Sequence, residues 1–293
     1  MINLWYEESY WNYTNGRKSG PEKVIINTID ALTQEKIPFS INQNKYSYNF
    51  LVQYQHEIAH RKHEKLEHNS CIIGPQVWPF DNDVYGNFLI NNPQYYKKII
   101  VPSQWVKDLY IKKLNISENK LDIWACGIPD LIKYNKKNKK YDCLIYFKNR
   151  SSEELHLVEN FLSLKGLTYQ IFSYGNYSQE DFLNAVGCSK FCFVLDNTES
   201  QGIAIQEIMS IGVPLLVWDV KYWDYLGKKF KVSASSIPYW SSKCGEKFYN
   251  FYDLELTFER FFDNIDYYTP QELVKTQLSY KVSVETILKI FKK

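Results

Sequence analysis

The sequence has almost no net charge, because 33 acidic residues nearly balance its 35 lysines and arginines. A formal charge of +2 gives no general attraction to nucleic acid or to an anionic membrane, so any anion site has to be local. No apolar run approaches the length of about 20 residues that a membrane-spanning helix needs. The first residues carry neither a basic segment nor an apolar run, so we expect no secretory signal and a cytoplasmic protein.

The six cysteines form no Cys-x-x-Cys pair, which argues against a redox motif or a zinc knuckle. Even Cys188 and Cys192 are too far apart in sequence for such a pair. Most of the six lie in apolar, strand-like runs, where a reduced cysteine packs as a small hydrophobic side chain. We therefore expect free thiols, in keeping with a cytosolic protein.

The length and composition are those of a globular protein that buries its own core. Apolar residues make up 45% of the chain and charged residues 23%, and 293 residues leave room for two domains of roughly 100 to 150 residues each. Aromatic residues reach 17%, with 24 tyrosines and 8 tryptophans. Aromatic faces suit sugar rings and nucleobases, although this composition alone does not decide the function.

Strand-like runs alternate with helix-like runs along both halves of the chain, which is typical of βαβ units around parallel sheets. The expected strands cover residues 3–6, 50–54, 71–77, 97–103, 121–125, 142–147, 168–174, 190–195 and 215–218. The expected helices cover residues 24–35, 57–68, 105–114, 153–166, 179–187 and 202–211, and a further helical segment follows residue 270. The polar, basic run NKKNKK at 135–140 is the best linker between two such halves.

Residues 199–207, ESQGIAIQE, place two carboxylates around Gly202 at the carboxyl end of an expected parallel strand. Ligands of open α/β sheets bind at such ends, and the first amides of the following helix attract an anion. Gly202 lets the backbone approach a phosphate closely. The alternative is that Glu199 and Glu207 are solvated surface residues, but Glu is rarely found in so apolar a stretch without a partner.

The order strand, Glu199, seven residues, Glu207, Gly-Val-Pro, strand resembles the retaining, nucleotide-sugar-dependent glycosyltransferases of the GT-B fold, of the glycosyltransferase family 4 type. Three other segments resemble that family in the same order. They are SGPEKVIINTIDAL, with Gly20 in the position of its N-terminal glycine loop; IIVPSQWVKDLY with CGIPD; and LIYFKNR, the first strand of the C-terminal domain.

The resemblance implies two Rossmann-like domains that face each other across a cleft, with the C-terminal helix crossing back to the first domain. The acceptor-side domain would cover residues 1–136 with the helix at 275–293, and the nucleotide-sugar-binding domain residues 141–270. It further implies transfer of a sugar, with retention and without a metal or other cofactor, from a nucleotide-diphosphate sugar to a glycan or another hydroxyl acceptor.

The same resemblance implies roles for single residues. Lys148 and Arg150 would bind the donor diphosphate, Glu199 the hydroxyls of the donor sugar, and Glu207 the ribose diol. Further donor contacts are expected from Ser200, Gln201, Gly202, Tyr174, Gly175 and Tyr177. The chain departs from the family pattern at Leu155, where a second basic residue is usual, and at Ser200, where a glycine is usual. The tyrosines equally suit ordinary turns in a tyrosine-rich chain.

A rival motif, HEIAH, occupies residues 56–60. On a helix it would place two imidazoles on one face for zinc, with Glu57 as the general base of a hydrolase. Arg61 and Lys62 follow where zinc hydrolases of this type have uncharged residues, which favours a solvated helix face. His56 remains a cleft candidate of the first domain, together with Gly20 and Gly74. A third alternative is an epimerase or a non-catalytic protein that binds a nucleotide sugar on the same fold.

Overall fold

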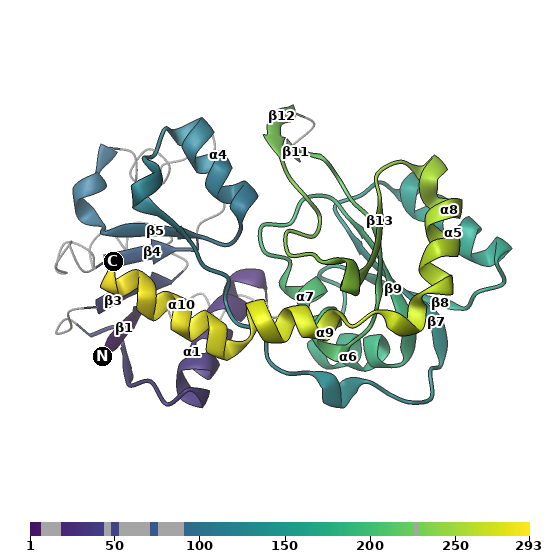
Figure 1. Ribbon diagram of the computed structural model, residues 1–293, viewed down its shortest axis with the longest axis horizontal. Coiled ribbons are helices and arrows are strands. Elements are labelled where there is room, and N and C mark those ends of the chain that lie inside the picture. The colour runs from purple at the N-terminus through teal and green to yellow at the C-terminus, as the bar shows by residue number, and fades with distance from the viewer. Residues whose placement is uncertain (7–18, 44–47, 53–70, 76–90, 226–227) are drawn as a thin grey trace. The chain divides into compact units, whose positions relative to one another are not determined.

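The computed structural model describes residues 1–6, 19–43, 48–52, 71–75, 91–225 and 228–293 (Figure 1). The chain divides into two compact units. The first unit consists of residues 1–127 and 278–293, and the second of residues 128–277. Each unit contains a parallel sheet with helices against it, so the expected Rossmann-like α/β build is confirmed for both.

The sheet of the first unit has six described strands in the order β2-β1-β3-β4-β5-β6, and all of its pairings are parallel. Their bounds are β1 (Ile2–Trp5), β2 (Phe39–Ile41), β3 (Tyr48–Val52), β4 (Cys71–Gly74), β5 (Lys98–Val101) and β6 (Leu121–Ile123). Strands such as β4 and β5 form because short runs rich in Ile and Val are buried on both faces of a parallel sheet.

Three described helices belong to this unit: α1 (Gly20–Gln34), α4 (Gln104–Leu114) and α10 (Tyr280–Lys292). Ser19 starts α1 with a capping box, in which the Ser19 hydroxyl accepts from the Glu22 amide and the Glu22 carboxylate accepts from the Ser19 amide. Helix α10 packs on α1 (Figure 1). The Trp124 indole donates to the Ser283 carbonyl at 3.0 Å. The expected return of the C-terminal helix to the first half of the fold is therefore confirmed.

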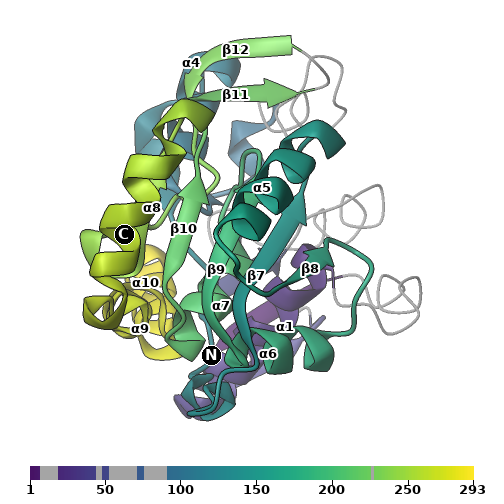
Figure 2. The ribbon, with the colours of Figure 1, turned by 90° about the vertical axis from the view of Figure 1, so that its right-hand side faces the viewer.

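The sheet of the second unit has the strand order β13-β10-β9-β7-β8, again with parallel pairings throughout. Its strands are β7 (Tyr141–Lys148), β8 (Tyr169–Ser173), β9 (Ser189–Asp196), β10 (Leu215–Trp218) and β13 (Gly245–Phe248). Figure 2 shows β10, β9, β7 and β8 side by side in this order. A separate antiparallel pair consists of β11 (Tyr222–Tyr225) and β12 (Lys228–Ser233).

Helices cover both faces of this second sheet. Their bounds are α5 (Ser152–Leu164), α6 (Gln179–Gly187), α7 (Ile203–Ile211), α8 (Leu254–Asp263) and α9 (Pro270–Leu273). Helices α5 and α8 pack on the face that carries Cys143, Ile145, Phe191 and Phe193, whereas α6 and α7 pack together on the opposite face. Short 3-10 turns lie at Pro93–Tyr95, Glu118–Lys120, Ile132–Tyr134, Ser242–Cys244, Phe251–Asp253 and Ile265–Tyr267, and a π-helical turn at Val274–Leu278.

The basic run at 135–140 is part of the second unit and hydrogen-bonds within it. The Lys136 amide donates to the Gly187 carbonyl at 3.0 Å, and the Lys140 amide to the Cys188 carbonyl at 2.8 Å. The chain changes unit between Gly127 and Ile128, ahead of this run. The two roles that the resemblance assigns to the domains, and the domain limits that go with them, stay predictions.

Replacing Gly187 by alanine is expected to destabilise the second unit by about 3 kcal/mol, because a packed interior has no room for an added group. A Cβ at Gly187 would lie 1.9 Å from the Tyr134 carbonyl oxygen, so the backbone would have to move. The matched control is Gly20→Ala, since a Cβ there meets nothing within 4 Å. Thermal unfolding should show a melting temperature lower by roughly 6–12 °C for Gly187→Ala and an unchanged one for the control; equal melting temperatures would contradict the tight contact.

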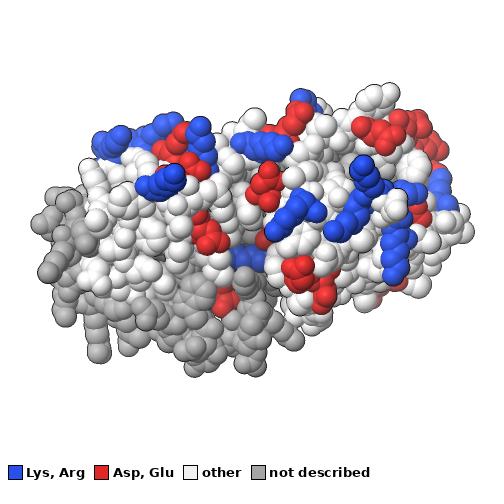
Figure 3. Space-filling model, turned by 90° about the horizontal axis from the view of Figure 1, so that it is seen from below, with Lys and Arg blue, Asp and Glu red and all other residues white. Residues whose placement is uncertain are grey.

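No described helix is long and apolar enough to cross a membrane. On the described part of the face in Figure 3, Lys and Arg side chains are interspersed with Asp and Glu, and no large area carries one sign of charge. This distribution agrees with the small net charge and with a local rather than a general site for an anion.

Candidate functional site at the carboxyl edge of the second sheet

The strand order of the second unit creates a switch point between β7 and β9. From β7 the chain passes to β8 on one side of it, and then returns to β9 on the other side. Loops diverge at such a point, and open α/β sheets bind ligands there, at the carboxyl ends of the strands. Lys148 and Asp196 are the last residues of β7 and β9 and lie directly opposite each other in the strand pairing.

The alternation of side chains along the two strands places Tyr146, Lys148 and Asp196 on one face of the sheet. This is the face that α6 and α7 cover, as the contact between the Tyr146 ring and Phe182 of α6 shows, with 5.9 Å between ring centroids. Neighbouring positions on β7, such as Ile145, belong to the apolar core on the other face. Polar and ionisable groups thus gather between one sheet edge and one pair of helices.

Lys148 is the central cation of this group. Its ammonium forms an ion pair with Glu199, lies 4.0 Å from Asp196 Oδ2, and sits 4.5 Å from the centroid of the Tyr174 ring. Burial alone would lower the pKa of Lys148, but the charges of Glu199 and Asp196 outweigh burial and raise that pKa above its usual value. Lys148 is therefore a permanent cation at neutral pH.

Glu199 lies on the loop that joins β9 to α7. Its amide donates to the Ser235 carbonyl at 3.0 Å, and the residue is 9% exposed. The loop ends at Gly202, whose φ of 82° is a left-handed conformation that favours glycine. Two amide side chains close the loop onto the helix, because Gln201 Nε2 donates to Gln206 Oε1 at 2.9 Å and Gln206 Nε2 donates to the Gln201 carbonyl at 2.8 Å.

Glu207 is buried on α7, on the same side of the sheet. Two tyrosines link its surroundings to those of Glu199. Tyr177 and Tyr146 are hydrogen-bonded to each other, and Glu207 is the negative charge that acts on Tyr177, whereas Glu199 is the one that acts most on Tyr146. Burial, followed by these charges, raises the pKa of both tyrosines above the usual value, so both hydroxyls stay protonated.

The turn after β8 completes the described group. Tyr174 is 47% exposed and covers Lys148, Gly175 has a φ of 82°, and the Tyr177 ring stacks on Phe182 with 4.8 Å between centroids. Tyr177 is therefore anchored in the core, whereas half of Tyr174 faces solvent. Ser200, between Glu199 and Gln201, is half-buried.

Asp196 was not predicted from the sequence, although it is the closing residue of an apolar strand. The residue is fully buried, and its Oδ1 accepts the Asn197 amide at 2.7 Å. Burial, and next the charge of Glu199, raises the pKa of Asp196 well above its usual range. The carboxyl groups of Asp196 and Glu199 are in hydrogen-bond contact.

Arg150 links two strand ends and one helix at this edge. Its Nε donates to the Asp196 carbonyl at 2.8 Å, Nη2 to the Trp218 carbonyl at 2.7 Å, and Nη1 to Glu154 Oε1 at 2.7 Å. The guanidinium also lies over the Trp218 ring, 5.1 Å from its centroid. Arg150 therefore links the carboxyl ends of β9 and β10 to the start of α5, and its expected contact with a diphosphate stays a prediction.

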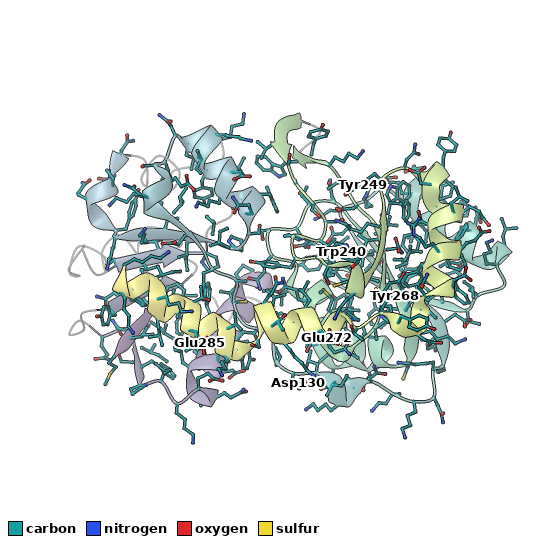
Figure 4. The ribbon with its side chains drawn as sticks, in the orientation of Figure 1. Asp130, Trp240, Tyr249, Tyr268, Glu272 and Glu285 are labelled. Carbon is teal, nitrogen blue, oxygen red and sulfur yellow. The ribbon has the colours of Figure 1, made fainter. Side chains whose placement is uncertain are left out.

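A second buried carboxylate at this edge, Asp219, was also missed by the sequence interpretation. It follows β10 and accepts from the Ser236 amide at 2.8 Å, from the Ser235 and Ser236 hydroxyls at 2.9 Å, and from Lys247 at 3.0 Å. Lys247 in turn lies 5.2 Å from the ring centroid of Trp240. Trp240 is labelled in Figure 4. These bonds fix the position of Ser235, whose carbonyl accepts a hydrogen bond from the Glu199 amide. Asp219 therefore helps to hold the loop of Glu199 in place.

The candidates of the first half of the chain lie in the first unit. Gly20 is the first residue of α1, and Gly74 ends β4 with a φ of 136°, which favours glycine. His56 and the whole HEIAH segment lie outside the described residues, and so does an Asp-x-Asp segment at 81–83. Among the described residues no group of three or more His, Cys, Asp or Glu side chains is placed to hold a metal ion. The expectation of a metal-independent protein therefore stays a prediction.

No protein-family model matches this chain. No curated protein matches its sequence either.

Solved structures of glycosyltransferases are similar to the chain over its whole length. A glycosyltransferase from Rickettsia africae ESF-5 matches with a TM-score of 0.62 at 13% identity, over 99% of this chain and 97% of that one. HepE of Anabaena, solved in complex with UDP-glucose, matches with a TM-score of 0.60 at 9% identity, over 100% and 99%. Sucrose-phosphate synthase of Thermosynechococcus elongatus matches with a TM-score of 0.56 at 8% identity, over 99% and 98%. The chain therefore has the GT-B fold of these glycosyltransferases, as the sequence resemblance implied.

Proposed function

We propose that this chain is a glycosyltransferase that takes a sugar from a nucleotide-diphosphate sugar and passes it to a hydroxyl acceptor, such as a glycan. The main support is the group at the switch point of the second sheet, where Lys148, Glu199 and Glu207 come together between β7, β9 and α7. The fold is shared with glycosyltransferases, one of which was solved with UDP-glucose.

In this proposal the donor diphosphate binds at the start of α7, where backbone amides after Gly202 lack helical partners and the helix dipole favours an anion. Lys148 supplies a positive charge beside that position. Breaking the bond between sugar and diphosphate leaves negative charge on the diphosphate, and stabilising this charge is the main catalytic task. Arg150 acts on the same step by holding the ends of β9 and β10 in place.

The two glutamates bind the uncharged parts of the donor. Glu207 accepts hydrogen bonds from the ribose diol, and Glu199 accepts them from hydroxyls of the donor sugar, because a carboxylate has two oxygens and suits vicinal hydroxyls. Tyr174 and Tyr177 border the place of the base, where the half-exposed ring of Tyr174 offers a face for stacking. The first unit receives the acceptor, and Gly20, His56 and Gly74 are its candidate contacts.

The reaction is proposed to proceed with retention and without a metal. The test is an assay of the purified chain with uridine, adenosine and guanosine diphosphate sugars, in which release of the nucleoside diphosphate and the anomer of the product are followed by NMR. We expect turnover of one donor class, an unchanged rate in excess EDTA, and a product anomer that matches the donor. Binding without turnover would instead favour the non-catalytic alternative, and loss of a hydrolase activity on zinc removal would favour the role of the HEIAH segment.

A further inference from the structure

Two carboxyl groups compete for one cation at the switch point. The strand pairing sets Asp196 directly opposite Lys148, yet the Lys148 ammonium pairs with Glu199 and stays 4.0 Å from Asp196 Oδ2. Lys148 therefore neutralises Glu199 first. The ion pair of Lys148 with Asp196 is the longer of the two, although Asp196 is the more deeply buried carboxyl group.

The hydrogen bonds of Asp196 are uneven. Oδ1 accepts the Asn197 amide at 2.7 Å, but among the described residues no donor reaches Oδ2, which is fully buried. An ionised carboxylate that leaves water without donors on both oxygens is costly, because the interior does not replace its hydration. A neutral carboxyl group avoids this cost and has an O–H group of its own to donate.

Glu199 is the acceptor nearest to that O–H group, since both carboxyl groups lie against the same Lys148 ammonium, and a hydrogen bond with Glu199 is among the causes that raise the pKa of Asp196. Two carboxylates cannot hydrogen-bond to each other unless one of them carries a proton. The other ionisable groups at this site include Lys148, whose ammonium is already paired with Glu199, and the hydroxyls of Tyr146, Tyr174 and Tyr177. Arg150 donates to the Asp196 backbone carbonyl but forms its ion pair with Glu154, and Glu207 acts on Tyr177. The two carboxyl groups and the ammonium balance in charge when one carboxyl group is protonated.

We propose that Asp196 is a positioning residue that keeps a proton at neutral pH and donates it in a hydrogen bond to the Glu199 carboxylate. Glu199 is then held from two sides, by the Lys148 ammonium and by the Asp196 carboxyl group. The consequence for catalysis rests on the proposed function, in which Glu199 contacts the donor sugar. The proton itself does not depend on that function.

Infrared spectroscopy of the full chain at neutral pH tests the proton directly. A protonated carboxyl group has a carbonyl stretch above the amide I band, and the difference spectrum between the wild type and Asp196→Asn should contain this stretch. Asp219→Asn is the matched control, because Asp219 is equally buried but accepts from Lys247 and several other donors. A stretch that is absent, or that Asp196→Asn leaves in place, would overturn the proposal whether or not the chain transfers sugar.

The pH dependence of stability gives an independent readout. A carboxyl group whose pKa is raised on folding binds its proton more tightly in the folded state. Its contribution to stability is therefore complete below the unfolded-state pKa of about 4 and is lost as the pH rises through the folded-state pKa. The folding equilibrium constant of the wild type should therefore fall relative to Asp196→Asn by about tenfold per pH unit above pH 4, until Asp196 ionises. A ratio that stays constant from about pH 4 to pH 8 would mean that Asp196 carries no extra proton.

Steady-state kinetics with the nucleotide sugar that proves to be the donor in the turnover assay tests the positioning role. Asp196→Leu removes the donor to Glu199 and should lower kcat by about tenfold or more, the usual effect of losing a hydrogen bond to a charged group. Asp196→Asn keeps an N–H donor and should restore most of that loss. Affinity for the nucleoside diphosphate should change less than threefold in both variants, since Asp196 does not touch it. Equal kcat values for the wild type and Asp196→Leu would overturn the positioning role, and melting temperatures separate this result from misfolding.

Discussion

Replacing Lys148 by methionine is expected to lower the free energy of unfolding by about 3–5 kcal/mol, the range found when one partner of a buried ion pair is removed. The variant removes the cation of the ion pair with Glu199, in a site where the lysine side chain is 16% exposed. The same change should weaken binding of a nucleoside diphosphate roughly 10- to 150-fold, because a hydrogen bond to a charged group contributes about 1.5–3 kcal/mol. Urea unfolding and isothermal titration calorimetry measure the two effects.

The matched control is Lys190→Met, which removes the ion pair of Lys190 with Asp142 in the same sheet. The Lys190 side chain is 51% exposed, and exposed pairs contribute about 0.2–1 kcal/mol. This control should retain nucleotide binding and nearly all of its stability. Equal losses in the two variants would show that the environment of Lys148 is no different from the surface.

The regular α/β core could be predicted because local patterns are strong there. The apolar runs around Ile99 and Phe193 are strands in the structure, and the helix expected from residue 202 is α7. The end of that helix was also predictable, since Gly212 takes a left-handed conformation with a φ of 85° and Pro214 follows it. In each of these segments the local preference and the global fold agree.

Other elements were missed because their stability comes from distant contacts. Strand β2 has three half-buried residues, and β13 runs through Gly245-Glu-Lys-Phe248, so neither carries an apolar run. The edge strand β13 exists because Leu215–Trp218 of β10 offers it a partner. Gly245 is needed there, since a Cβ at this position would lie 1.8 Å from the Leu215 carbonyl oxygen. No local sequence pattern predicts such a contact between distant residues.

The candidate site was partly predictable for a related reason. The order of strand, glutamate, helix and second glutamate indicated Glu199 and Glu207, and the family resemblance of LIYFKNR indicated Lys148. Asp196 and Tyr146 were missed, although their positions carried a signal. Tyr146 lies two residues before Lys148 on the same strand and so faces the same side, and Asp196 is the charged residue that ends an apolar strand. What the sequence could not supply is the pairing of β7 with β9, which sets Lys148 against Asp196.

Replacing Glu199 or Glu207 by alanine should impair the proposed reaction in two different ways. Glu199 neutralises Lys148, so Glu199→Ala frees a positive charge and should bind the nucleoside diphosphate, which lacks the sugar, at least as tightly as the wild type. The same variant should lower kcat more than donor affinity, because contacts to the reacting sugar tighten as charge develops in the transition state. Glu207→Ala removes contacts to the ribose that exist before and during the reaction, and should lose roughly 10- to 150-fold in nucleotide affinity.

Calorimetry with the nucleoside diphosphate and steady-state kinetics with the full donor separate these outcomes. Glu180→Ala is the control, since Glu180 is an exposed glutamate of α6 in the same unit and should change neither quantity. A loss of nucleotide affinity in Glu199→Ala would mean that Glu199 holds the nucleotide itself, in place of the sugar. If Glu199→Ala, Glu207→Ala and the control all bind and turn over alike, the carboxylates are structural residues, and the ion pair with Lys148 serves the fold alone.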